Sequence, residues 1–477
     1  MRVRLVLTLL LLAVPCVAAD GLPDLGEVAQ AGFSPLQERR LGESIMREIR
    51  ADRSFLDDAE ATDYIATLGN RIASRAPGAR QDFDFFLIQD RQINAFALPG
   101  GFVGVHTGLV LAAQSESELA GVLAHEIAHV AQRDIARMIA QQKQSQVTSL
   151  AVLAAAILLS RVSSQAAEAA AAFGQAGIVQ SQLNFTRDAE RAADRIGLQI
   201  LEQAGFDPRA MAVFFERLQR ATRVYETGAP SYLRTHPLTF ERIADMQGRT
   251  ESLPYRQVPD SVEFQLVRAK LKAQSEAPRE AVAFFEESLA ERKFLSEAAG
   301  RYGLALGLAR ANDYARARKE LAALRRLVPA SPIVETFACA LASATGEVGA
   351  ALSCYREARK AYPTYRALVY DYADALLQAR QPEAALRLID ERLQVVADDY
   401  RLYLLKARAH AALNQRLVQY RAQAEAYARM GNLTAAVEQL QIGLKSGDGD
   451  FYQLSSAEAR LRELRKLDEE QRRENKR

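Results

Sequence analysis

The stretch GVLAHEIAHVAQRD, residues 121–134, contains two of the five histidines in this 477-residue chain. His125 and His129 are four positions apart, and Glu126 follows the first of them. Apolar residues recur at helical spacing, so we expect a helix on which both imidazoles share one face and can bind one metal ion. Glu126 points about 100° away, toward a metal-bound water. The alternative is a helix with two structural histidines.

A third ligand would decide between these two interpretations, and Glu190 is the best candidate. No further histidine follows His129 at the close spacing of an all-histidine site, and a glutamate completes the His₂Glu type of zinc site. Asp194 is four residues after Glu190, on the same helical face, where it can accept the outer N–H of a ligand histidine. Spacing alone leaves open that both acids belong to a solvated helix face.

A small sheet is predicted just before this helix. Residues 83–87 alternate in polarity as a half-buried strand does, and residues 94–98 and 102–106 are short strands on either side of a Pro-Gly-Gly turn. We expect these three strands to form a small antiparallel sheet.

Beyond about residue 261 the sequence changes to alanine-rich helical segments that recur about every 34 residues. The clearest unit contains Ala424, Gly431 and Ala436, small residues that let two helices cross closely. The pattern resembles the tetratricopeptide repeat, a solenoid whose concave surface suits polypeptides; the alternative is chance periodicity in alanine-rich helices. Cys339 and Cys354 lie in this region, and the sequence does not decide between a disulfide and two small buried residues.

The first 19 residues have the features of an export signal: Arg2 and Arg4, a short apolar run, and small residues before Asp20. The alternative is a buried N-terminal helix. Removing the signal takes the 61 Lys and Arg to 59, against 59 Asp and Glu, so no net charge remains to attract nucleic acid. No later apolar run is long enough for a transmembrane span, which excludes a membrane-embedded protease and leaves peripheral membrane contact open.

Two motifs together carry a family resemblance. HEIAH at 125–129, followed after a long insertion by FTRDAERAAD at 185–194, resembles the signature of the HtpX/Ste24-like zinc metallopeptidases. NAFALPGG at 94–101 is similar to their substrate-side strand, which implies that residues 94–98 pair with an extended polypeptide substrate by strand addition. An exported chain with tetratricopeptide repeats resembles the periplasmic branch of that family. The implied fold is mostly α, with a zincin-like α+β metalloprotease domain followed by an α-helical repeat solenoid.

The resemblance also implies roles for individual residues. It implies one Zn²⁺ per chain, with three ligands: His125, His129 and Glu190. Glu126 is then the general base for attack of a zinc-bound water on the peptide carbonyl, and Asp194 supports catalysis from beside the ligands. His236, in RTHPLTFERI, matches a residue that takes the fourth zinc position in a resting state. His106 and His410 match no catalytic position.

The sequence therefore predicts four regions: a signal peptide at 1–19, a zinc metalloprotease domain at 20–255, a repeat domain at 261–450 and a charged tail at 451–477. The resemblance implies a periplasmic endopeptidase of Gram-negative bacteria that acts on misassembled or unfolded outer-membrane β-barrel proteins and contacts their assembly machinery, with a chaperone-like role. The apolar segment at 150–180 is a candidate lid. A non-proteolytic repeat scaffold and a different zinc hydrolase are the alternatives.

Overall fold

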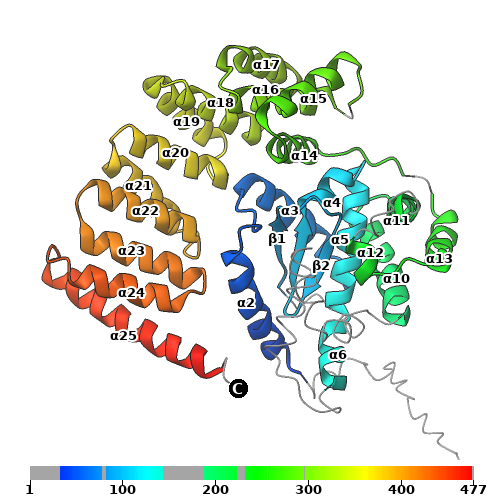
Figure 1. The fold of residues 1–477 in the computed structure, drawn as a ribbon, viewed down its shortest axis with the longest axis horizontal. Helices are drawn as coiled ribbons and strands as arrows, with labels where there is room; N and C mark the ends of the chain where they lie inside the picture. Colours follow the sequence, from blue (N-terminus) through cyan, green and yellow to red (C-terminus); the bar gives the residue numbers. More distant parts are fainter. Residues whose placement is uncertain are drawn as a thin grey trace, which may run out of the picture.

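The computed structural model describes residues 33–77, 82–142, 187–222, 231–254, 256–294 and 296–474. The predicted signal peptide at 1–19 and the segment at 150–180 lie outside the described residues. Within them the chain is mostly helical with one small sheet, so the predicted class is confirmed. Figure 1 shows the sheet with helices around it in one half of the molecule, and an arc of helix pairs in the other half.

The sheet is mixed, which corrects the predicted antiparallel sheet. Its strands are β1 (Asp84–Ile88), β2 (Ala95–Leu98) and β3 (Phe102–His106), in the order β1-β3-β2. β2 turns back onto β3 and pairs with it antiparallel, whereas β1 pairs parallel with the far side of β3. The periodicity of the sequence could not show this, because it does not encode which strand takes the middle position.

Gly104 explains why β3 is central. A side chain at this position would meet Phe96 on one neighbouring strand and Phe86 on the other within 2.8 Å. The glycine therefore leaves room for two aromatic rings to pack over the middle strand. Both rings are buried, and β1 is more buried than the alternating pattern of residues 83–87 predicted.

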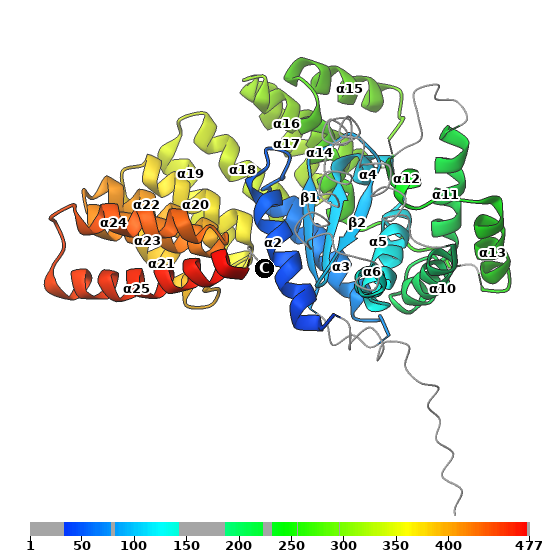
Figure 2. The same cartoon turned by 60° about the horizontal axis from the view of Figure 1, so that its bottom comes forward.

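One helix runs through the middle of the half that contains the sheet. α5 (Glu116–Ala131) carries the HEIAH motif, and every residue from Glu116 to Val130 is buried. It packs against β2 and four of the described helices, and Figure 2 shows it beside the sheet. The helices of this half are α2 (Pro35–Ala51), α3 (Ala59–Ala73), α4 (Thr107–Ala112), α5, α6 (Asp134–Gln142), α10 (Arg187–Gln203), α11 (Arg209–Thr222), α12 (Ser231–Thr235) and α13 (Phe240–Glu251).

The second half consists of helix pairs at the predicted spacing, although the sequence unit with Ala424 and Ala436 spans two successive pairs. The first helices of successive pairs start 33 to 35 residues apart. The pairs are α14 (Val262–Ser275) with α15 (Pro278–Ala290), α16 (Glu297–Arg310) with α17 (Tyr314–Leu327), α18 (Pro332–Ala344) with α19 (Val348–Ala361), α20 (Arg366–Gln378) with α21 (Pro382–Leu393), α22 (Tyr400–Ala412) with α23 (Arg416–Arg429), and α24 (Leu433–Leu444) with α25 (Phe451–Glu474). Helix pairing at a constant spacing argues against chance periodicity.

The sequence left open whether the two cysteines of the repeats pair, and after residue 450 it predicted only a charged tail. Cys339 on α18 and Cys354 on α19 form a disulfide that joins the two helices of one pair. The charged tail forms helix α25, and its Leu461 and Leu464 are buried against α24. The tail is therefore a packed part of the solenoid in the described residues.

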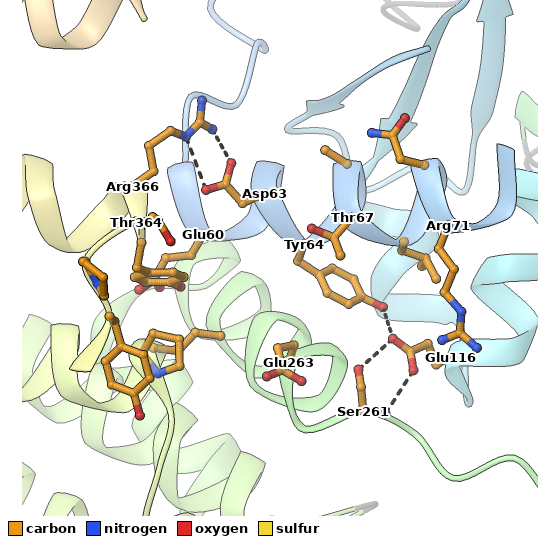
Figure 3. A pocket seen from close by; sticks show the side chains of 18 of the residues that line it. Glu60, Asp63, Tyr64, Thr67, Arg71, Glu116, Ser261, Glu263, Thr364 and Arg366 are labelled. Carbon is orange, nitrogen blue, oxygen red and sulfur yellow. Dashed lines mark hydrogen bonds and ion pairs between the residues drawn. The ribbon is translucent and has the colours of Figure 1, made fainter. Parts of the chain in front are cut away.

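The arc of repeats meets the sheet-containing half along α3. Lys270 on α14 lies 2.7 Å from Asp58 Oδ2 and 2.8 Å from Glu60 Oε2 at the start of α3, and Arg366 on α20 pairs with Asp63. A cavity of about 870 Å³ lies between α3 and this part of the arc. Figure 3 shows its polar lining, in which the Tyr64 hydroxyl donates to Glu116. The domain boundary between residues 255 and 261 remains a prediction from the sequence.

Candidate metal centre

α5 and α10 bring the predicted ligands together. The Nε2 atoms of His125 and His129 are 3.1 Å apart, and each lies 3.5 Å from one carboxylate oxygen of Glu190. The two helices approach closely at Gly197, where a Cβ atom would come within 3.3 Å of the backbone of His125. Glu190 is therefore part of a buried cluster, which decides against the solvated helix face.

His236 closes the cluster from a third segment. It directly follows α12, and its Nδ1 lies 3.0 Å from Glu190 Oε1 and 3.4 Å from His125 Nε2. Its Nε2 lies 3.5 Å from Glu126 Oε1. The ring of Tyr232, one turn earlier, stacks on it with centroids 4.8 Å apart. His236 thus lies between the ligand side chains and the predicted base.

Carboxylates hold the outer nitrogens of both α5 histidines. Asp194 Oδ1 is 3.1 Å from His125 Nδ1, where the sequence predicted an acceptor. Asp134 Oδ2 is 2.7 Å from His129 Nδ1, a partner that sequence reasoning missed although it ends the quoted stretch. Such contacts fix the tautomer, so that Nε2 of each ring can face a metal ion.

Arg242, on α13, is the second residue that sequence reasoning missed. Its Nε and Nη2 donate to the two oxygens of Asp194 at 2.7 and 2.8 Å, and its Nη1 lies 2.8 Å from Glu190 Oε2. Burial alone would raise the pKa of Asp194, but the hydrogen bonds from Arg242 and His125 lower it. The quoted segment RTHPLTFERI contains this arginine, yet no spacing rule connects it to an acid 48 residues earlier.

The four side chains fit a zinc ion. Donor atoms about 2.0–2.1 Å from a tetrahedral centre are about 3.3 Å apart, and the donor atoms named above are separated by 3.0 to 3.5 Å. One donor atom from each residue lies within 4.8 Å of the others. Three imidazoles and one carboxylate are the donors that zinc prefers.

Comparisons with known proteins agree with this geometry. The model of peptidase family M48 matches residues 59–250. The β-barrel assembly-enhancing protease of Escherichia coli (strain K12) is 34% identical over 453 residues, covering 95% of this chain and 93% of the relative. The chain belongs to peptidase family M48.

Two further relatives show how far this likeness extends. The β-barrel assembly-enhancing protease of Yersinia pestis is 34% identical over 459 residues, covering 95% of this chain and 93% of the relative. The mitochondrial metalloendopeptidase OMA1 of Schizosaccharomyces pombe is 33% identical over 224 residues, 46% of this chain and 62% of the relative. This M48 chain is therefore a metallopeptidase, which decides against a different class of zinc hydrolase.

The charges of the M48 site also call for a cation. Glu126 is fully buried, and neither of its carboxylate oxygens accepts a hydrogen bond from the described residues. Glu190 and Asp194 share the single guanidinium of Arg242. Buried carboxylates without a compensating charge are strongly unfavourable, so a divalent ion would balance this cluster.

The other two histidines lie apart from the M48 site. His106, in β3, has its Nδ1 3.8 Å from Asp90 and its ring against Phe96. His410, in α22, has its Nδ1 2.7 Å from the side-chain oxygen of Gln415. Neither is in the ligand cluster, which agrees with the sequence analysis. None of the described helices combines the length and apolarity needed to cross a membrane.

Proposed function

We propose that this M48 metallopeptidase is an exported zinc endopeptidase that acts on misassembled or unfolded outer-membrane β-barrel proteins in the Gram-negative periplasm. The convergence of His125, His129 and Glu190 beside the buried Glu126 carries the proposal. The names of the relatives support the substrate class, and the repeats support chaperone-like binding of polypeptides. The disulfide of α18 and α19 favours an oxidising compartment.

Each residue of the site has a separate role in the proposed reaction. In the proposed site one Zn²⁺ is held by three ligands: His125, His129 and Glu190. A bound zinc ion supplies Lewis-acid activation of water and of the peptide carbonyl. Glu126 accepts a proton from the attacking water and later delivers it to the leaving amine. Asp194 and Asp134 keep the ligand imidazoles in the required tautomer.

Tyr232 is our candidate for stabilising the charge that develops on the carbonyl oxygen. Its hydroxyl is buried and has no hydrogen-bond partner among the described residues. Burial and the nearby acids Glu126 and Glu190 hold its pKa well above the usual range, so it stays protonated. A protonated donor in a water-poor site can stabilise an oxyanion.

Substrate access requires a movement of His236. The side chains of the cluster are 0 to 2% exposed in the described residues, so a polypeptide cannot reach Glu126 in this state. We propose that His236 occupies the fourth ligand position at rest and leaves to admit substrate. Residues 94–98 then pair with the extended chain, as the sequence suggested, so the cleavage preference should be broad.

The test compares wild type with Glu126→Gln on an unfolded β-barrel protein. We expect cleavage to fall by about 10²- to 10⁴-fold while zinc content stays at one per chain, because Glu126 moves a proton and does not bind the metal. Cleavage fragments are measured by gel and mass spectrometry, and zinc by atomic emission. The control is Glu241→Gln, an exposed acid on α13 paired with Arg191.

The same variant separates the peptidase from a non-proteolytic scaffold. Glu126→Gln should retain trapped β-barrel proteins when purified from an envelope extract. Undiminished cleavage by Glu126→Gln would remove the residue from its role. Wild type that binds unfolded protein but never cleaves it, with or without a chelator, would leave only the scaffold.

A further inference from the structure

A cavity of about 600 Å³ lies where the first repeat meets the peptidase half. It is lined by α14, by α15, by the connection after α15, by the first turn of α16 and by Leu111 of α4. No residue of the metal centre lines it. Its volume is within the ~300–1,000 Å³ of typical ligand pockets.

Aromatic side chains form the apolar part of this cavity. Phe264 and Phe285 are buried, whereas Phe284 is 45% exposed, and Phe294 adds a fourth ring. Phe284 and Phe285 are in edge contact, with ring centroids 5.1 Å apart. An exposed phenylalanine beside buried ones leaves apolar surface that a ligand can cover.

The charged side chains lining the cavity all have the same sign. Among the described residues no acid lines it, and four cations do: Arg268, Lys272, Arg292 and Lys293. Lys272 and Lys293 pair with Glu276 and Glu291, which lie outside the lining. A ligand with a negative group would therefore meet cations in the lining, two of which are paired with acids just outside it.

Two of these cations have particular surroundings. The Nε of Arg268 is buried without a hydrogen-bond partner among the described residues, although Nη2 donates to Leu111 O. The Nζ of Lys272 lies 4.5 Å from the centroid of the Phe284 ring, so charge and apolar surface meet at one point. The ligand that fits carries a negative group next to an apolar one.

The start of α16 adds to the same preference. Ser296, Ala299 and Gly300 of its first turn line the cavity. The N-terminal end of a helix carries a partial positive charge and favours anions. The N-terminal end of α16 and the four cations therefore line the same cavity.

We propose that this cavity binds the C-terminal carboxylate of a polypeptide whose last residue has a large apolar side chain. The carboxylate lies among the cations and the side chain against the phenylalanines. Gln265 also lines the cavity and can hydrogen-bond peptide groups, which a fatty acid lacks, while Ser288 Oγ donates to Lys293 O and can accept from a peptide N–H. The site would recognise chain ends without cleaving them, so it goes beyond the proposed hydrolysis.

The test measures binding of an N-terminally labelled octapeptide ending in phenylalanine, by fluorescence anisotropy. The protein is the zinc-loaded full chain carrying Glu126→Gln, which keeps the peptide intact. We expect the C-terminal carboxamide, and separately a peptide ending in serine, to bind about tenfold more weakly or worse. Lys272→Gln with Arg292→Gln should cause a similar loss, and Lys272→Arg with Arg292→Lys should restore binding.

Two single variants test whether the peptide binds in this cavity. Phe284→Ser should weaken binding, and Lys319→Gln, at an exposed lysine of α17, should not. Equal binding of acid and amide, or unchanged binding by Lys272→Gln with Arg292→Gln, would overturn the proposal. Binding of dodecanoate without binding of the peptide would identify a fatty-acid site and overturn it too. Cleavage of internal bonds by wild type is a separate measurement, so failure here leaves the proposed hydrolysis intact.

Discussion

The metal centre and the arc of repeats hold their charges in opposite ways. At the centre, Glu190, Asp194 and Arg242 are at most 3% exposed, and each contacts partners far away in the sequence. In the arc, Arg318 pairs with Glu347 and both side chains are 47% exposed, about one repeat apart. The comparison teaches that single substitutions should disable the centre, whereas the arc should lose stability in small steps.

The largest effect is expected from Arg242→Gln, which leaves two buried carboxylates without their cation. Zinc affinity should fall about 10- to 100-fold, as for other outer partners of metal ligands. The unfolding free energy of the peptidase half should fall by about 3–5 kcal/mol, because breaking a buried ion pair leaves a buried charge without a partner. Competition with a chromophoric chelator measures the first effect, and denaturant unfolding measures the second.

Arg242→Lys is the matched control for charge. It keeps one positive group but loses the two-pronged contact with Asp194, so it should lie between wild type and Arg242→Gln. If Arg242→Gln binds zinc as wild type does, the centre does not depend on its buried partners, and the contrast with the arc fails.

The same contrast explains what the sequence could predict. His125, Glu126 and His129 are close together on one helix, so helical geometry alone predicted that they belong to one metal site. The helix pairs of the arc recur at a constant spacing along the sequence, so they too could be predicted from a local pattern. Glu190 was a candidate from its chemistry, but spacing left it open whether the acid is buried, because no periodicity connects α5 with α10. His236 was reached only through the family resemblance.

Long-range pairing is what the sequence could not supply. Arg242 is 48 residues from Asp194, and nothing in its local pattern identifies the acid that it binds. The middle position of β3 depends on how Gly104 admits two rings from other strands, which is again a tertiary property. Asp134 is the exception: it is near His129 in sequence, and the reasoning used for Asp194 could have found it.

Removing the disulfide tests the arc at its strongest local bond. Cys339→Ala with Cys354→Ala opens a loop of 15 residues and should lower the unfolding free energy of the repeats by about 3 kcal/mol. Zinc content and cleavage of a short peptide should stay at the wild-type level, because the bond lies within α18 and α19. Reductant should destabilise wild type by a similar amount and leave the double variant unchanged; a loss of zinc would show that the halves are not independent.

A smaller effect, in the opposite direction, is expected from His236→Ala. Removing the resting-state ligand should raise peptide cleavage at least about threefold, since a larger fraction of molecules is competent to bind substrate. Initial rates and zinc content are measured together, with His410→Ala as the control. If rate and zinc disappear together, His236 is a simple ligand and the resting-state proposal is wrong.

The smallest effect is expected at the junction of the two halves. Arg366 and Asp63 form an ion pair whose side chains are 33% and 36% exposed, so Arg366→Gln should cost only about 0.2–1 kcal/mol. A double-mutant cycle with Asp63→Asn isolates the coupling, and about 1 M salt should reduce it toward zero. A cost as large as that of Arg242→Gln would mean that half-exposed pairs also control the fold, and burial would then not be what separates the metal centre from the arc.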